Sequence, residues 1–165
     1  MTDTKSKFLE QIDSDNIDKP KPFLSGGSIL SSVGVVEIKV GEKAGHIYRL
    51  ARIPSSARLH SLQVQFSGLH YSPEGFSLGL YCPTAKNSGC AVRKELFASA
   101  LLGTPGVQEI VGYGGKGLFG IEQRLWEMLE LKKDPFLEYD ICLTTEGDIT
   151  SENSNIVCLK VLWVL

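Results

Sequence analysis

The feature that most constrains this chain is a pair of β-rich runs within Ser31–Ile53. The first run, Val33–Val40, and the second, His46–Ile53, are joined by the five-residue polar segment Gly41–Gly45. Pro54 follows and predicts the end of the second strand, because proline has no N–H to donate to a sheet ladder. Two such runs around a short glycine-containing loop are typical of an antiparallel hairpin. We therefore expect a β-rich molecule organised around a hairpin at this position.

Four later segments also have the patterns of strands, which are strict alternation or a continuous apolar run. They are Arg58–Phe66, Phe76–Tyr81, Leu137–Leu143 and Asn155–Leu165. In the first of them, His60 is expected to share the apolar face with Leu62, Val64 and Phe66. The last segment is apolar on both faces, which predicts a central strand or one that another subunit covers.

Two segments favour helix. Arg93–Leu102 has a helix-forming composition and is followed by Gly103 and Pro105, and Ile121–Leu131 has helical apolar spacing. Strands do not alternate regularly with these helices, so a doubly wound α/β fold is disfavoured. The pattern predicts a mainly β fold: an antiparallel, jelly-roll-like β-sandwich with two short helices inserted and an extended N-terminal arm.

Residues 1–27 are predicted to form that arm, and residues 28–165 a single β-sandwich domain. The prolines favour an extended path, and Gly26–Gly27 provides a flexible joint. Two interpretations stay open: a tail disordered in the isolated chain, or an arm that orders on a neighbouring subunit. In the second, the contacts are expected from Phe8, Leu9, Ile12, Pro20, Pro22, Phe23 and Leu24.

Charge and hydropathy exclude several classes of partner. The net charge is −2 and the pI about 5.9, so no global basic field would attract nucleic acid or an anionic membrane. No apolar run approaches the roughly 20 residues of a membrane helix. The N-terminus lacks the apolar core of a secretory signal. We expect no nucleic-acid partner, no membrane partner and synthesis in a cytosol.

The cysteines and histidines form no metal or catalytic motif. Cys82, Cys90, Cys142 and Cys158 contain no CxxC pair, and His46, His60 and His70 have no HxxH spacing. We expect four free thiols, although Cys82 and Cys90 flank a turn-rich loop and could pair if oxidised. No GxSxG sequence marks a nucleophile. The expectation is therefore no enzyme, no catalytic residue, no metal and no cofactor.

Two alternative functions depend on isolated signals. Gly112, Gly114 and Gly117 match G-x-G-x-x-G, but the helix expected after them begins too late and no βαβ unit surrounds them. A structural glycine loop is therefore favoured over a nucleotide site. The other alternative is a ligand- or receptor-binding β-sandwich, whose groove would be lined by Tyr71, Tyr81 and Tyr113.

Arg49, Arg52 and Arg58 form a small basic cluster around Ile53–Ser56. Exposed aromatic residues that would stack on bases are not interleaved with them. A solvated face, or ion pairs to another subunit, is therefore favoured over nucleic-acid binding. Together with Trp163 of the final apolar run, these arginines complete the predicted interface.

Several motifs, in their order and spacing, resemble a recurrent pattern in small tailed-bacteriophage proteins. The matching stretches are Ser28–Glu37, Gly45–Arg49, Arg52–Arg58, Gly79–Tyr81, Phe97–Ala100, Gly117–Glu122 with Leu125–Trp126, and Asp134–Pro135 with Tyr139–Ile141. They cover most of residues 25–144, and the arm and the loop between Cys82 and Cys90 match least. The chain is thus similar to a family of small phage virion structural proteins.

The resemblance implies a non-enzymatic virion component and supplies no catalytic residues. A capsid decoration or cement protein, which stabilises the head through inter-subunit contacts, is the first choice. A neck, tail or fibre-associated protein is the alternative. The implied partners are the major capsid protein or other virion proteins, and further copies of the chain in a homo-oligomer. The implied location is the virion, after synthesis in the bacterial host cytoplasm.

Overall fold

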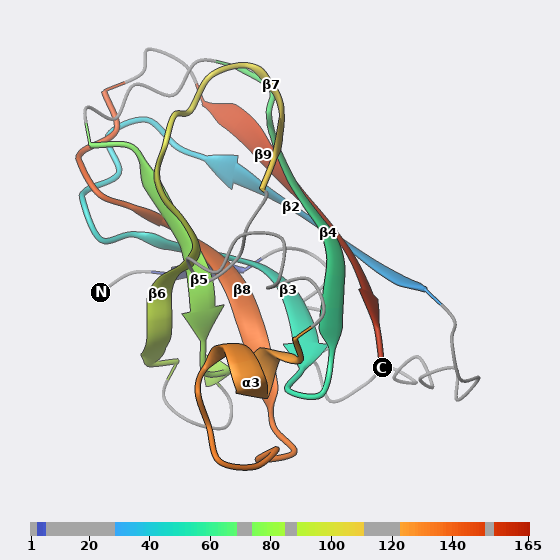
Figure 1. Cartoon of the computed structure of the whole chain (residues 1–165). Coiled ribbons are helices and arrows are strands. Elements are labelled where there is room, and N and C mark those ends of the chain that lie inside the picture. Colours follow the sequence, from blue (N-terminus) through green and yellow to red (C-terminus); the bar gives the residue numbers. More distant parts are fainter. Residues whose placement is uncertain (1–2, 6–28, 69–73, 85–88, 111–122, 151–153) are drawn as a thin grey trace, which may run out of the picture.

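The computed structural model describes residues 3–5, 29–68, 74–84, 89–110, 123–150 and 154–165. In these ranges the chain forms nine strands and one short helix (Figure 1). They are β1 (Asp3–Lys5), β2 (Leu30–Ile38), β3 (Ile47–Pro54), β4 (Arg58–Phe66), β5 (Phe76–Tyr81), β6 (Ala91–Leu101), β7 (Gly106–Glu109), α3 (Leu125–Met128), β8 (Glu138–Thr145) and β9 (Asn155–Val164).

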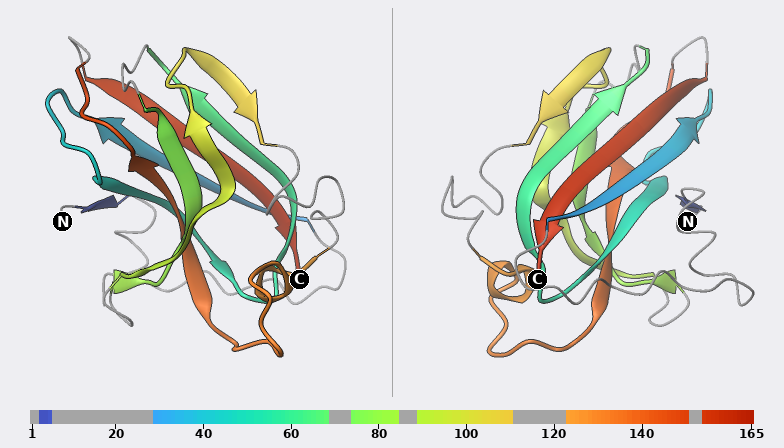
Figure 2. Two further views of the ribbon diagram at one scale, coloured as in Figure 1. Left: turned by 60° about the vertical axis from the view of Figure 1, so that its left-hand side comes forward. Right: turned by 90° about the vertical axis from the view of Figure 1, so that its right-hand side faces the viewer.

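The strands form two sheets that lie one against the other (Figures 1 and 2). One sheet has five strands in the order β1-β3-β8-β5-β6, and the other has four in the order β2-β9-β4-β7. The assigned pairings are antiparallel except for β1 with β3, which is parallel. The prediction of a mainly β fold is confirmed. Its jelly-roll connectivity stays a prediction.

Both sheets contribute to one apolar core. In β9, Val157, Leu159 and Val161 are fully buried, as the period of two along a strand requires of residues on one face. The ring of Phe66 on β4 lies 5.4 Å from the ring of Phe76 on β5, centroid to centroid, and so links the two sheets. Burial of this layer stabilises the fold mainly through the hydrophobic effect.

The predicted strand positions are confirmed in several places. β4 and β5 have the predicted bounds, and β8 and β9 begin or end within two residues of theirs. The predicted face of His60 is wrong, because the register of β4 against β9 shifts between Leu59 and Ser61. The shift leaves His60 exposed and buries Leu59 and Leu62.

The predicted hairpin is wrong, because its two strands belong to different sheets. β2 pairs with β9 along its whole length, and β3 pairs with β8. The segment between β2 and β3 turns a corner, where the Gly41 N–H donates to the Ile149 carbonyl (3.2 Å) and the Gly45 N–H donates to the Thr145 carbonyl (2.8 Å). These bonds join the β2–β3 corner to the β8–β9 corner at the same end of the molecule.

The helix predicted at Arg93–Leu102 is also wrong, because most of this segment forms β6 at the edge of the five-stranded sheet. Pairing with β5 and burial of Leu96 and Phe97 override the helical preference of the composition. The pairing is irregular, with register shifts along its length. A side chain at Gly79 would overlap the carbonyl oxygens of Arg93 and Lys94, so glycine permits this close approach.

The helix predicted at Ile121–Leu131 is reduced to the short α3, which buries Leu125 and Met128. The Glu127 carboxylate accepts a hydrogen bond from the Arg124 N–H at 2.7 Å and so caps its first turn. The helix ends before Glu130, whose φ of 59° lies in the left-handed region. Residues 121–122 lie outside the described residues, and the described ranges contain this one helix in place of the two predicted.

β2 and β3 approach each other closely at Gly34, where a Cβ atom would overlap the carbonyl oxygen of Leu50. The Gly34→Ala substitution should therefore lower the free energy of unfolding by about 1–3 kcal/mol, because one backbone must move away. Urea denaturation measures this change. Ser31→Ala, at an exposed position of the same strand, is the control and should shift the midpoint little. An unshifted midpoint for Gly34→Ala would contradict the close approach.

Candidate interaction surfaces

The structure describes only some of the residues that the sequence offered as candidates for chemistry. In the part of the chain that the structure describes, no group of three or more His, Cys, Asp or Glu side chains could hold a metal ion. His46 is buried and His60 is exposed, while His70 lies outside the described residues. The glycines of the G-x-G-x-x-G match also lie outside them. No helix in the described ranges has the length and apolarity needed to cross a membrane.

Three tyrosines were predicted to line the groove of a ligand-binding β-sandwich, and one of them, Tyr81, is buried. Tyr81 is 1% exposed, and its hydroxyl shares a hydrogen bond of 2.7 Å with Thr144 Oγ1. It therefore lines no open groove. Tyr71 and Tyr113 lie outside the described residues.

Arg49 and Arg52, predicted on a basic surface, are instead buried around one carboxylate. Asp140 on β8 is fully buried and accepts hydrogen bonds from Arg52 Nε at 2.6 Å, Arg52 Nη2 at 3.2 Å and Arg49 Nη1 at 3.0 Å. The register of β3 against β8 sets Arg52 directly opposite Asp140. The guanidinium of Arg49 also donates to the carbonyls of Cys82 (3.0 Å) and Gly89 (2.9 Å).

This ionic cluster has a structural role within the chain. It ties β3 to β8 and holds both ends of the segment that leads from β5 to β6. The guanidinium carbon of Arg49 also lies 5.8 Å from the centre of the Tyr81 ring, within the range of a cation–π contact. The solvated basic face that the sequence favoured is therefore absent at Arg49 and Arg52, and of the three arginines Arg58 alone is exposed.

Replacement of Asp140 by Asn should lower the free energy of unfolding by about 3–5 kcal/mol, because two buried guanidinium groups would lose the carboxylate that they share. Urea denaturation of the purified chain measures the loss. The control is Asp148→Asn, which removes an exposed carboxylate paired with Lys43 Nζ at 2.8 Å and should change stability little. Equal effects of the two substitutions would show that the buried cluster contributes no more than a surface ion pair.

All four cysteines are free thiols in the structure, and pairing of Cys82 with Cys90 on oxidation stays a prediction. The Cys82 N–H donates to the Cys90 carbonyl at 2.8 Å, so the two residues lie side by side at the base of their loop. Burial, and next a hydrogen bond with the Cys90 side chain, raise the pKa of Cys82 to about 11. Cys90 is exposed. The two neighbouring thiols therefore differ in reactivity.

Alkylation with iodoacetamide at pH 8 should modify Cys90 well before Cys82. With a pKa near 11, roughly one Cys82 side chain in a thousand is a thiolate at that pH. A time course followed by peptide mass spectrometry measures both rates. Cys142, which is fully buried, serves as the internal control and should react only after unfolding in urea. Equal rates at Cys82 and Cys90 would contradict the assigned environment.

The described part of the N-terminus lies on the edge of the five-stranded sheet. β1 pairs in parallel with β3, with Thr4 opposite Tyr48, and Thr4 Oγ1 lies 2.9 Å from His46 Nε2. The Glu42 carboxylate is 3.7 Å from the same nitrogen. The predicted arm contacts Phe8, Leu9, Ile12, Pro20, Pro22, Phe23 and Leu24 all lie outside the described residues. Their role stays a prediction.

Trp163, the last of the predicted interface residues, is partly buried against the core. Its Nε1 donates to the Ser32 hydroxyl at 3.2 Å, across the pair of strands β2 and β9. This hydrogen bond links β9 to β2 within the four-stranded sheet. A role of Trp163 or of the exposed Arg58 in contacts with another subunit stays a prediction.

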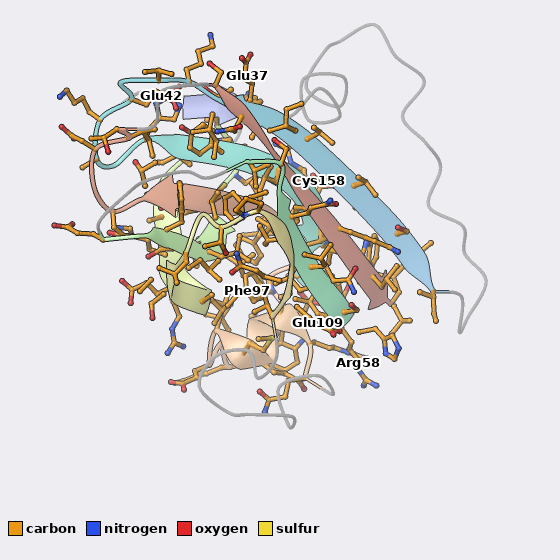
Figure 3. The ribbon with its side chains drawn as sticks, turned by 90° about the horizontal axis from the view of Figure 1, so that it is seen from above. Glu37, Glu42, Arg58, Phe97, Glu109 and Cys158 are labelled. Carbon is orange, nitrogen blue, oxygen red and sulfur yellow. The ribbon has the colours of Figure 1, made fainter. Side chains whose placement is uncertain are left out.

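The outer face of the four-stranded sheet is an apolar surface that the sequence revealed only in part. Figure 2 (right) shows this sheet face on, from β7 through β4 and β9 to β2. Val33 and Val35 on β2, Val107 on β7 and Ile156 on β9 are between 45% and 61% exposed. In Figure 3, Glu37, Cys158 and Glu109 mark the strands β2, β9 and β7 of the same sheet. We call this surface the outer face.

Sequence reasoning found the two-sided apolar character of β9 but missed the other strands of the outer face. The alternation in β2 was the available signal, because Val33, Val35 and Glu37 occupy every second position. β7 gave no such signal, since it has only four residues. The outer face can therefore be recognised only when the pairing of the four strands β2, β9, β4 and β7 is known.

Two solved structures share this fold almost from end to end. The chain is similar to a chain in the capsid of Ralstonia phage GP4, with a TM-score of 0.67 and 17% identity over 99% of this chain and 97% of that one. It is also similar to a chain of the cyanophage Pam1 capsid asymmetric unit, with a TM-score of 0.57 and 11% identity over 93% of this chain and 95% of that one. No family model and no curated protein matches the chain. At these identities the likeness shows a shared fold.

Proposed function

We propose that this chain is a non-enzymatic structural component of a phage virion, and specifically a capsid decoration or cement protein. It would stabilise the head by contacts with the major capsid protein and with neighbouring copies. The observation that carries the proposal is the likeness, over 99% of this chain, to a chain of the Ralstonia phage GP4 capsid. Because the match spans 99% of this chain, it supports one role for nearly the whole chain.

The geometry supports a role based on contacts. Two tightly packed sheets provide a rigid body, and the outer face presents apolar side chains to solvent. Exposed apolar patches of this kind mark sites of protein association. Each contact can be weak, because symmetric repetition on a particle multiplies the effective affinity.

The experiment that tests the proposal uses particles of the phage that encodes the chain. Particles assembled without the chain are mixed with the purified protein, and cryo-electron microscopy and quantitative mass spectrometry give its position and copy number. We expect many copies in a regular arrangement on the head, and particles that release their DNA at a higher temperature once decorated. Absence from the particle would overturn the virion role. A position in the neck, tail or fibre would overturn decoration of the head.

Deletion of residues 1–24 should leave the domain folded but weaken its binding to particles, roughly tenfold or about 1.4 kcal/mol. The deletion removes β1 and the predicted arm contacts while the shared core stays intact. Binding isotherms on undecorated particles measure the change, and circular dichroism checks the fold. A full-length variant with Phe8, Leu9 and Ile12 replaced by Ser separates the apolar contacts from the length of the arm. Unchanged binding of the truncated chain would remove the arm from the mechanism.

A further inference from the structure

We propose that the outer face is a two-fold interface on which a second copy of this chain docks face to face. The inference deepens the structural role proposed above, because it names the partner of the outer face. Its test uses the isolated chain, so the result does not depend on whether the chain binds particles.

The strand register arranges the centre of the outer face into two rows that each cross all four strands. Val35 is opposite Cys158, Cys158 is opposite Gln65, and Gln65 is opposite Val107. We call this the apolar row. The other row is shifted by two residues and runs from Val33 through Lys160 and Gln63 to Glu109. We call this the charged row.

A two-fold axis that runs along the strands, midway between β9 and β4, overlaps all four strands of two such faces. It places β2 of one copy over β7 of the other, and β9 over β4, while each row stays over itself. In the apolar row, Val35 then lies over Val107 of the second copy, and each is about half exposed in the single chain. Since the contact is isologous, Val107 meets Val35 of the second copy in return.

The charged row supplies the complementary charges. Lys160 of one copy lies over Gln63 of the second copy and one strand away from that copy's Glu109, about 4.8 Å along the sheet. Both side chains are exposed, and within the described ranges neither has an ion-pair partner. The same axis produces this pair twice. A second copy therefore provides the complement of both charges from the same two residues, whereas an unrelated partner would need its own matching pair.

The area of the outer face predicts a weak association. Four strands 4.8 Å apart, with about six residues in each of the three longer strands and four in β7, present on the order of 400 Å² per copy. That is about half of the roughly 800 Å² per partner found in stable complexes. The pair of copies should thus form reversibly at high protein concentration, and repetition on a particle would make the same contact persistent.

Sedimentation equilibrium of the purified chain, from micromolar to millimolar concentration, tests the proposal. The wild-type chain should show a monomer–dimer equilibrium. Lys160→Glu and Glu109→Lys should each weaken dimerisation at least about tenfold, because each places two like charges together at the interface. An equimolar mixture of the two single variants should recover dimers, since both charged contacts of a mixed pair again join one acidic and one basic side chain.

The matched controls lie off the outer face. Lys132→Glu and Glu95→Lys reverse exposed charges elsewhere and should leave the equilibrium unchanged. Val35→Asp should abolish dimerisation, whereas Val92→Asp, at an exposed valine of the five-stranded sheet, should not. Circular dichroism and urea denaturation confirm that each variant folds.

Three results would overturn the proposal: a wild-type chain that stays monomeric at millimolar concentration, single reversals without effect, or a mixture that fails to recover dimers. A monomeric chain whose particle binding is lost in Val35→Asp would assign the outer face to another virion protein. A chain that dimerises as predicted but does not bind particles would support the interface and contradict the proposed function.

Discussion

The apolar layer shared by the two sheets is the constraint on which the rest of the structure depends. Each sheet turns one face toward this layer. Consecutive strands such as β2 and β3 belong to different sheets and border the layer from its two sides. The connecting corners are then hydrogen-bonded to each other, and glycine is required at Gly34 where the layers come close. Each sheet has a second face that points away from this layer. On the five-stranded sheet that face buries Asp140, and on the four-stranded sheet it is the exposed outer face.

The charged side chains of these two faces differ in burial and in their partners. On the five-stranded sheet, Asp140 and the two arginines form a buried ionic cluster, in which both guanidinium groups pair with the one carboxylate of this chain. On the four-stranded sheet, Lys160 and Glu109 are exposed, and the described part of the chain holds no ion pair for either. Charge on the first face therefore stabilises the monomer, while charge on the second is available to a neighbour. The two chains of phage capsids share the fold that carries both faces.

The sequence predicted individual strands well and their partners poorly. Alternation gave β4 and β5 with their observed bounds, because the period of two is a local property. The hairpin failed because the partner of β2 is β9, which lies far along the chain and leaves no mark on the local pattern. β6 failed because pairing with β5 overrode a helical composition. The arginines were placed outside because their carboxylate partner, Asp140, is about ninety positions away, and the rows of the outer face depend on four segments at once.

β9 follows both of its partner strands, β2 and β4, in the chain, so their sheet can be completed only late in synthesis. Its ladder with β2 joins residues as far apart as Leu30 and Trp163, and it also supplies a neighbour for β4. Until the ribosome has delivered this segment, β2 lacks its ladder and β4 has only the short ladder with β7, and long-range pairing is slow to form. A nascent chain accordingly carries no finished outer face. The sheet that carries the outer face is therefore completed only after translation has passed β9.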